Sequence, residues 1–234
     1  MNIWITGAGR GIGAAIARRA ARAGAGIALS GRNDETLVAL AAELEAAGAR
    51  VCVARCDVGD EDSVRAAFEA AHGALGSIDV LVNNAGETVF LPFMKSGVAD
   101  LDRLLRTNVR GAFLCTQAVL PGMLERGAGT VVMINSVASR DVFSDSSLYS
   151  ASKAGLKALT DCLRHEVRKS GVRIVSIFPG ATGTEIWPAR VLEKHGHRMM
   201  ASADVAEAVW HTLELPAGVL VEDLYMQPIG GPLS

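Results

Sequence analysis

The sequence predicts an α/β protein built on one doubly wound parallel sheet of about seven strands, with helices on both faces. Short apolar runs alternate along the chain with longer segments that carry helical periodicity. Runs such as Val131–Ile134 are apolar at consecutive positions, which is typical of strands buried on both faces. No repeat, low-complexity tract or linker interrupts this alternation, so we expect residues 1–234 to form a single domain.

The expected elements follow one another along the chain. Strands are expected at 2–6, 26–30, 50–56, 78–83, 129–135, 172–178 and 219–226. Helices are expected between them, at 12–24, 34–47, 61–75, 99–126, 147–170 and 203–214. Asp60 and Ser202 stand where N-capping residues belong. Five of the helices are followed by a glycine, where a left-handed residue is favoured: Gly24, Gly48, Gly76, Gly127 and Gly171.

Composition and charge argue against a nucleic-acid-binding, membrane-spanning or metal-binding protein. The net charge of −2 gives no electrostatic basis for binding nucleic acid or an anionic membrane. No apolar run reaches the roughly 20 residues that span a bilayer, and the N-terminus is typical of a strand rather than a signal peptide. The histidines form no ligand set and the cysteines lack metal-ligand spacing, so no metal is expected. We expect reduced thiols, in the core or just below the surface of a cytoplasmic protein, at Cys52, Cys56, Cys115 and Cys162.

Residues 6–13, Thr-Gly-Ala-Gly-Arg-Gly-Ile-Gly, join the first strand to the first helix. Gly7 permits a sharp turn, while Gly9 and Gly11 let the backbone approach a pyrophosphate. The N–H groups at the start of the helix, near Ile12, are unpaired within it and face such phosphates. The spacing is GxxxGxG rather than the commoner GxGxxG, and a glycine-rich turn without a ligand is the alternative interpretation.

The second strand indicates which dinucleotide would bind. In NAD-binding domains of this kind an acidic residue closes that strand and binds the ribose 2′-hydroxyl. Here the strand ends Gly31-Arg32, with no carboxylate at that end, and Arg10 supplies a second cation nearby. A 2′-phosphate would therefore meet two guanidinium groups and no repelling acid. We expect NADP, with NAD as the alternative; the other interpretation of Arg32 is an ordinary loop residue.

A phenol and an ammonium group are expected on one helical face, because Tyr149 and Lys153 are four residues apart. A free phenol, with a pKa of about 10, is a poor base at neutral pH. A neighbouring cation favours the phenolate and lowers that pKa. Ser136 ends a strand at the sheet edge where ligands gather, so its hydroxyl is suited to hold a substrate oxygen. The alternative for Tyr149 alone is a core residue with a solvated hydroxyl.

These motifs together resemble the short-chain dehydrogenase/reductase family, over about residues 1–182. The resemblance rests on TGxxxGIG at 6–13, Asn83-Asn84-Ala85-Gly86, Asn108, Ser136, the Tyr149/Lys153 pair and Pro179-Gly180. It implies a Rossmann-type fold, a nicotinamide dinucleotide and the interconversion of alcohols and carbonyls. It also implies a homodimer or homotetramer that packs through the two long helices, here about 99–126 and 147–170.

The resemblance assigns roles to individual residues. Tyr149 would be the general acid and base, Lys153 would also bind the nicotinamide ribose, and Asn108 would hold a water in a proton relay to Lys153. Ser136 would hold the substrate oxygen. The remaining cofactor contacts would come from Asp57 and Val58 at the adenine, Asn84, Ala85 and Gly86 beside the adenosine ribose, and Pro179, Gly180, Thr182 and Thr184 at the carboxamide. A plain loop carboxylate is the alternative for Asp57.

Residues 183–200 are expected to form a substrate lid. Its basic residues, Arg190, Lys194, His195, His197 and Arg198, either attract an anionic substrate tail or belong to a mobile, solvated loop. We expect an apolar pocket wall made of Phe90, Phe93, Phe143 and Trp187.

The expected function is NADP-dependent reduction of a ketone or aldehyde, such as a 3-oxoacyl thioester or another small ketone. A sugar or polyol dehydrogenase is the alternative within the same class. A dinucleotide-sensing regulator without turnover is the alternative in another class, and a sensor would have no need of Tyr149, Lys153 and Ser136.

Overall fold

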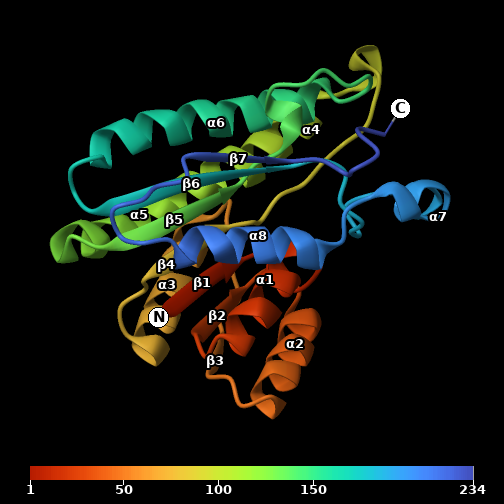
Figure 1. Cartoon of the computed structure of the whole chain (residues 1–234). Helices are drawn as coiled ribbons and strands as arrows, with labels where there is room; N and C mark the ends of the chain where they lie inside the picture. Colours follow the sequence, from red (N-terminus) through yellow and green to blue (C-terminus); the bar gives the residue numbers. More distant parts are fainter. Residues whose placement is uncertain (234) are drawn as a thin grey trace.

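Seven parallel strands form one sheet in the computed structural model, which describes residues 1–233. Their order across the sheet is β3-β2-β1-β4-β5-β6-β7 (Figure 1). The chain starts near the middle with β1, adds β2 and β3 on one side of it, and then adds β4 to β7 on the other side. The strands are β1 (Asn2–Thr6), β2 (Gly26–Ser30), β3 (Val51–Val53), β4 (Val80–Asn83), β5 (Gly129–Ile134), β6 (Val172–Pro179) and β7 (Asp223–Met226). The predicted doubly wound fold is confirmed.

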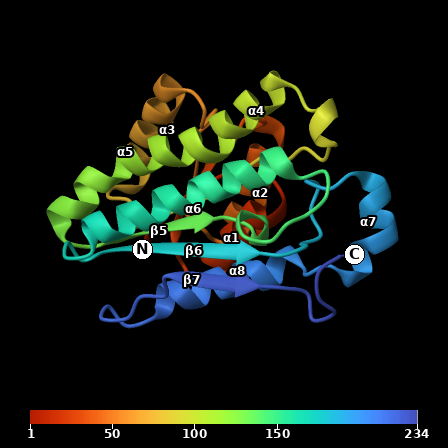
Figure 2. The ribbon, with the colours of Figure 1, turned by 90° about the horizontal axis from the view of Figure 1, so that it is seen from above.

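Helices cover both faces of this sheet. Figure 1 shows α5 and α6 on one side and α1, α2 and α8 on the other, and Figure 2 shows α7 beyond the carboxyl ends of the strands. The helices are α1 (Gly11–Arg22), α2 (Asp34–Ala46), α3 (Glu61–Leu75), α4 (Val98–Leu105), α5 (Gly111–Arg126), α6 (Ser147–Val167), α7 (Ala189–His195) and α8 (Ser202–Glu214).

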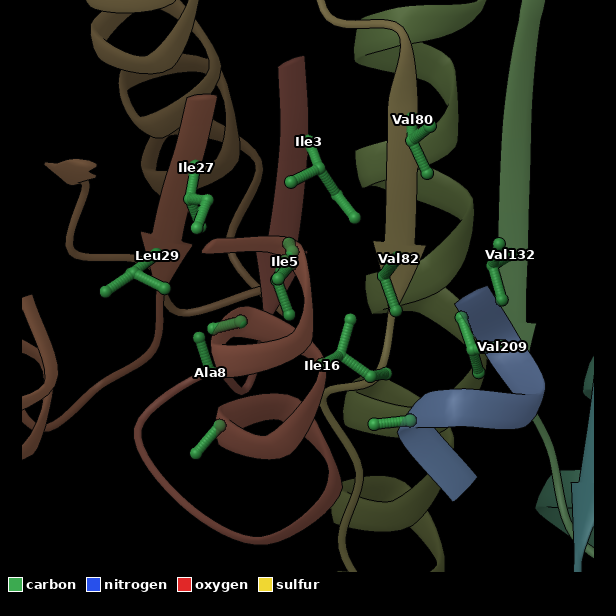
Figure 3. Packing of buried hydrophobic residues seen from close by; sticks show 14 of the residues in the cluster. Ile3, Ile5, Ala8, Ile16, Ile27, Leu29, Val80, Val82, Val132 and Val209 are labelled. Atoms are coloured by element: carbon green, nitrogen blue, oxygen red, sulfur yellow. The ribbon is translucent and has the colours of Figure 1, made fainter. Parts of the chain in front are cut away.

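The consecutive apolar residues of the central strands fill two cores. Ile3 and Ile5 of β1 pack with Ile16 of α1 and Val209 of α8 on one face (Figure 3). Trp4, between them in sequence, belongs to the core on the opposite face, which also contains residues of α3, α5 and α6. This alternation follows from the period of two along a strand, and it explains why apolar residues occupy consecutive positions in these strands.

Most helix ends lie where the sequence predicts them. The Asp60 carboxylate accepts a hydrogen bond from the Ser63 N–H at 2.8 Å and caps α3. All five glycines expected after helices have positive φ. The prediction for Ser202 is wrong: it is the first residue of α8, and Asp204 instead accepts from the Ala201 N–H.

Three expected elements differ from the prediction. The expected strand 50–56 is regular only over Val51–Val53, and beyond it the N–H groups of Ala54 and Cys56 still donate to the carbonyl oxygens of Leu29 and Gly31. The expected strand 219–226 begins at Asp223, after a turn closed by the Val219 N–H. The long helix 99–126 is divided into α4 and α5 by a π-helical segment, Arg106–Arg110.

The cysteines of the described chain are all free. Cys56 and Cys115 are buried and Cys52 is half-buried, as expected, but Cys162 is exposed on α6, so the prediction of a covered thiol is wrong there. Across residues 1–233, no helix has both the length and the apolar character required to cross a membrane.

Candidate active site

A cavity of about 780 Å³ opens at the carboxyl ends of the central strands. Its position matches the crevice of an open α/β sheet, where the strand order reverses and ligands bind. The cavity brings together every catalytic and cofactor-binding residue predicted from the sequence except Asn108. Its lining includes Gly7, Gly9, Arg10, Gly11, Ile12, Arg32, Asp57, Val58, Asn84, Ala85, Gly86, Ser136, Tyr149, Lys153, Pro179, Gly180, Thr182 and Thr184.

The glycine-rich turn leaves room for a ligand's phosphates at the start of α1. Gly7 has φ of +62°, and a Cβ there would stand 2.9 Å from the Cα of Ala85. A Cβ on Gly13 would meet the carbonyl oxygen of Gly7, so the last glycine of the motif is required by packing. The first turn of α1 carries no acidic side chain, so its unpaired N–H groups and the helix dipole favour an anion. These residues fit the pyrophosphate of a dinucleotide.

The turns after β1 and β4 are tied together by hydrogen bonds. The Thr6 hydroxyl oxygen accepts from the N–H groups of Asn84 and Ala85, at 3.1 and 3.0 Å. The Asn84 amide in turn donates to the carbonyl oxygens of Thr6 and Gly7, at 2.9 and 3.0 Å. Asn84 therefore fixes the glycine-rich turn against the neighbouring strand.

The cavity end beside β2 and β3 is lined by paired charges. Asp57 lies 2.9 Å from the Arg106 guanidinium and also accepts from the Gly59 N–H. Desolvation raises the pKa of Asp57, but these hydrogen bonds outweigh it and the pKa is lowered. Arg32 forms an ion pair with Glu87, with Nη2 and Oε1 2.8 Å apart. The expectation that no acid stands beside Arg32 is therefore wrong, because Glu87 reaches it from the segment after β4.

The Tyr149 and Lys153 side chains lie together at the other end, beside Ser136. Lys153 is only 4% exposed, and its Nζ donates to the carbonyl oxygen of Ile134 at 2.9 Å. Burial lowers the pKa of Lys153 to about 8. Desolvation raises the pKa of Tyr149, and a hydrogen bond with the Ser136 side chain opposes this rise. The three groups can exchange a proton with a ligand's oxygen and hold that oxygen in place.

Asn108 lies in the π-helical segment and outside the cavity lining. Its Oδ1 accepts from the Glu87 N–H at 2.8 Å, and its Nδ2 donates to the Glu87 carbonyl oxygen and to the Ser152 hydroxyl, both at 2.9 Å. Ser152 donates in turn to the Tyr149 carbonyl oxygen. Asn108 thus joins the segment after β4 to the first turns of α6, and the predicted water relay stays a prediction.

Aromatic side chains form an apolar part of the cavity lining. Phe90 and Trp187 stack with their ring centroids 5.1 Å apart, and Phe143 also lines the cavity. The prediction for Phe93 is wrong: it belongs to a short 3₁₀ turn, is 71% exposed and does not line the cavity. Within the expected lid, α7 brings His195 to the cavity, whereas Arg190, Lys194, His197 and Arg198 stay outside its lining.

A family model described as short chain dehydrogenase matches residues 1–194. The chain belongs to the short-chain dehydrogenase family. A farnesol dehydrogenase from Aedes aegypti is 38% identical over 97% of this chain and 95% of that protein. The structure of a serine dehydrogenase in its closed form with NADP+ has a TM-score of 0.93 and 31% identity, and covers 100% of this chain and 97% of that one. A 7α-hydroxysteroid dehydrogenase with NADH and 7-oxo glycochenodeoxycholic acid has a TM-score of 0.90 and 30% identity, over 100% and 94% of the two chains.

Several polar residues that line the cavity of this short-chain dehydrogenase are not predicted from the sequence, and two of them, Asn135 and Glu87, lie directly beside predicted site residues. Asn135 is 3% exposed; its Oδ1 accepts from the Ser136 N–H, and its Nδ2 has no hydrogen-bond partner among the described residues. Its place one residue before Ser136 was the signal that could have found it. Glu87 follows Asn83–Gly86 directly, but only the fold shows that its carboxylate meets Arg32.

Proposed function

We propose that the protein is an NADP-dependent oxidoreductase that reduces a ketone or aldehyde to an alcohol, with Tyr149 as the general acid. One observation carries this proposal. Tyr149, Lys153 and Ser136 converge in the same cavity as the glycine-rich turn of α1. A site for a dinucleotide and a site for proton transfer are thus continuous.

The residues that would hold the cofactor line the cavity from one end to the other. The turn Gly7–Gly11 and the N–H groups near Ile12 would bind the pyrophosphate, and Asp57 and Val58 would face the adenine. Arg10 and Arg32 would bind the 2′-phosphate, and the NADP+ of the serine dehydrogenase neighbour supports this choice. Asn84, Ala85 and Gly86 would pass beside the adenosine ribose, and Pro179, Gly180, Thr182 and Thr184 would face the nicotinamide. When bound, the cofactor supplies the hydride.

The protein's own residues would handle the proton. As the substrate oxygen gains negative charge during reduction, Tyr149 gives it the phenolic proton, while the Ser136 hydroxyl donates a hydrogen bond to the same oxygen. The Lys153 ammonium, cationic below its pKa of about 8, stabilises the phenolate that remains. Asn108 would hold the water through which Tyr149 is reprotonated by way of Lys153.

The substrate we propose is a ketone, or the corresponding alcohol, with an apolar body. Phe90, Phe143 and Trp187 offer aromatic surface in the same cavity as Tyr149, and Ile186 and Val191 add aliphatic surface to its lining. Such a wall suits an aliphatic or alicyclic ketone, including the acyl chain of a 3-oxoacyl thioester. A sugar or polyol would leave its hydroxyl groups without partners there, which disfavours that alternative. The names of the farnesol and hydroxysteroid dehydrogenases support the same choice.

A panel of carbonyl compounds tests this function. We expect purified protein to be stabilised against heat by NADPH, and to consume the NADPH absorbance with apolar ketones faster than with sugars. Binding without turnover across the whole panel would instead favour the dinucleotide sensor. Turnover restricted to sugars or polyols would replace the proposed substrate class.

We also propose a cytoplasmic homodimer or homotetramer that packs through α5 and α6. Phe113 on α5 is 44% exposed and Leu124 is 41% exposed, so a partner chain packed against this helix would bury apolar surface. On α6, Ala154, Ala158 and Cys162 are exposed and small enough to allow close helix packing. Sedimentation velocity at micromolar concentration should show an oligomer, and a monomer there would refute the proposal.

A further inference from the structure

The carboxylate of Glu87 lies between two guanidinium groups. Its Oε1 is 2.8 Å from Nη2 of Arg32, and its Oε2 is 2.7 Å from Nη1 of Arg103. The Glu87 side chain is only 15% exposed, whereas those of Arg32 and Arg103 are 63% and 45% exposed. Glu87 is thus a partly buried acid that two surface arginines share.

The backbone of Glu87 is held in place. Asn108 accepts from its N–H at 2.8 Å and donates to its carbonyl oxygen at 2.9 Å. The residue also follows Asn84–Gly86, whose first member is bonded to the glycine-rich turn. The carboxylate therefore cannot leave Arg32 by a movement of its own segment, and the flexible, exposed Arg32 is the partner that can move.

We infer that Glu87 determines cofactor selectivity, because its carboxylate competes with a 2′-phosphate for the Arg32 guanidinium. The inference rests on the proposed binding of NADP at this cavity. Glu87 and Arg32 both line that cavity, so an anion bound by Arg32 would also stand near the Glu87 charge. The carboxylate neutralises part of the attraction that Arg32 offers to a phosphate and adds repulsion of its own. Glu87 thereby weakens the preference for NADPH over NADH.

Arg103 has the opposite effect through the same carboxylate. It lies on α4 and binds Glu87 and Asp100, and it is not among the residues that line the cavity. With Arg103 present, the charge of Glu87 is shared between two cations. Without it, Arg32 would be left as the principal cationic partner of Glu87 and would be held more firmly. The two substitutions Glu87→Gln and Arg103→Gln should therefore change cofactor selectivity in opposite directions.

Isothermal titration calorimetry with NADPH and NADH measures this effect directly. We expect Glu87→Gln to raise the ratio of the NADH Kd to the NADPH Kd by roughly 3- to 10-fold at low salt, and Arg103→Gln to lower it by about 2- to 5-fold. Glutamine keeps the shape of the side chain, so the Asn108 bonds to the backbone persist. Glu43→Gln is the matched control, because it removes the carboxylate of another surface ion pair, with Arg18 at 2.7 Å, that lies outside the cavity lining and contacts neither Arg32 nor Arg103, so its ratio should not change.

Added salt provides a second measurement on the wild-type protein and on Glu87→Gln. The difference between their two ratios should shrink as the ionic strength rises, because salt screens the interactions of the exposed Arg32. An unchanged ratio in Glu87→Gln, or a fall in its NADPH affinity, would overturn the inference, since the carboxylate would then be inert or would position Arg32 for the phosphate. Wild-type protein that binds neither nucleotide would refute the proposed function instead.

Discussion

The two ends of the cavity control charge in different ways. At the end with Tyr149 and Ser136, the cation Lys153 is 4% exposed and its pKa is lowered to about 8 by burial. At the opposite end, Arg32 is 63% exposed and is paired with Glu87. Burial lowers the pKa of a cation, so its charge depends on pH. An exposed cation keeps its charge, and its interactions depend on neighbouring charged groups and on the salt concentration. Substitutions at the two ends should therefore change different measurable quantities.

Tyr149→Phe should have the largest effect. The phenolic oxygen is lost while the ring still packs, so we expect turnover to fall by roughly 10²- to 10⁴-fold, as for the loss of a positioned general acid. NADPH affinity should stay within a few-fold of wild type. Single-turnover kinetics and calorimetry measure the two effects separately. If more than a tenth of wild-type turnover remained with chemistry rate-limiting, another group would be the acid.

Lys153→Met should affect both binding and chemistry. The ammonium would hold the nicotinamide ribose as well as stabilise the phenolate, so we expect a higher NADPH Kd together with slower turnover. The effect on both NADPH binding and turnover distinguishes Lys153 from Tyr149, whose substitution should affect turnover alone. A variant that slows turnover with an unchanged NADPH Kd would limit Lys153 to the proton transfer.

Arg32→Asp tests the exposed end of the cavity. The change removes a charge-assisted contact and places a second carboxylate beside Glu87, so it should shift preference towards NADH by ~2–4 kcal/mol, or roughly 30- to 1,000-fold. Turnover at saturating NADH should change little, because Tyr149 and Lys153 are untouched. The ratio of kcat/KM for the two cofactors is the measurement. A wild-type protein that prefers NADH tenfold would contradict the assignment.

The pH dependence of reduction should show the smallest effect, and it tests the buried end. The pKa of Lys153 lies near 8, below its ordinary value, so the ammonium is lost as the pH rises through 8. Because the cation stabilises the phenolate, kcat/KM for reduction should fall above that pH by up to about tenfold per unit. Tyr149 remains protonated in this range because its own pKa is raised. Lys153→Met should lack this decline, and a flat wild-type profile up to pH 10 would rule out the role of Lys153.

The sheet and most of the proposed cofactor-binding residues could be predicted from the sequence because the patterns that indicate them are local. Consecutive apolar residues identify a buried strand, and Gly7 stands next to the strand it terminates. The pairing of Arg32 with Glu87 could not be predicted in this way, since the two residues are far apart in the chain and only the sheet order brings them together. The prediction for Phe93 is wrong for a related reason: its aromatic character predicts burial, but the 3₁₀ turn exposes it. The π-helical segment around Asn108 has no simple periodic signature, so the sequence predicts a continuous helix.

The bonds between Thr6 and Asn84 have a consequence for synthesis of the chain. The two residues are 78 positions apart, yet each supplies hydrogen bonds that hold the turn of the other. A nascent chain that has left the ribosome only as far as α3 contains the glycine-rich motif but lacks the strand and amide that brace it. We expect such an N-terminal fragment not to bind nucleotide. Binding should become possible only after β4 has entered the sheet beside β1. Nucleotide in the cell would then act as a ligand of a chain already folded through β4 rather than as a guide for the folding of the segment before it.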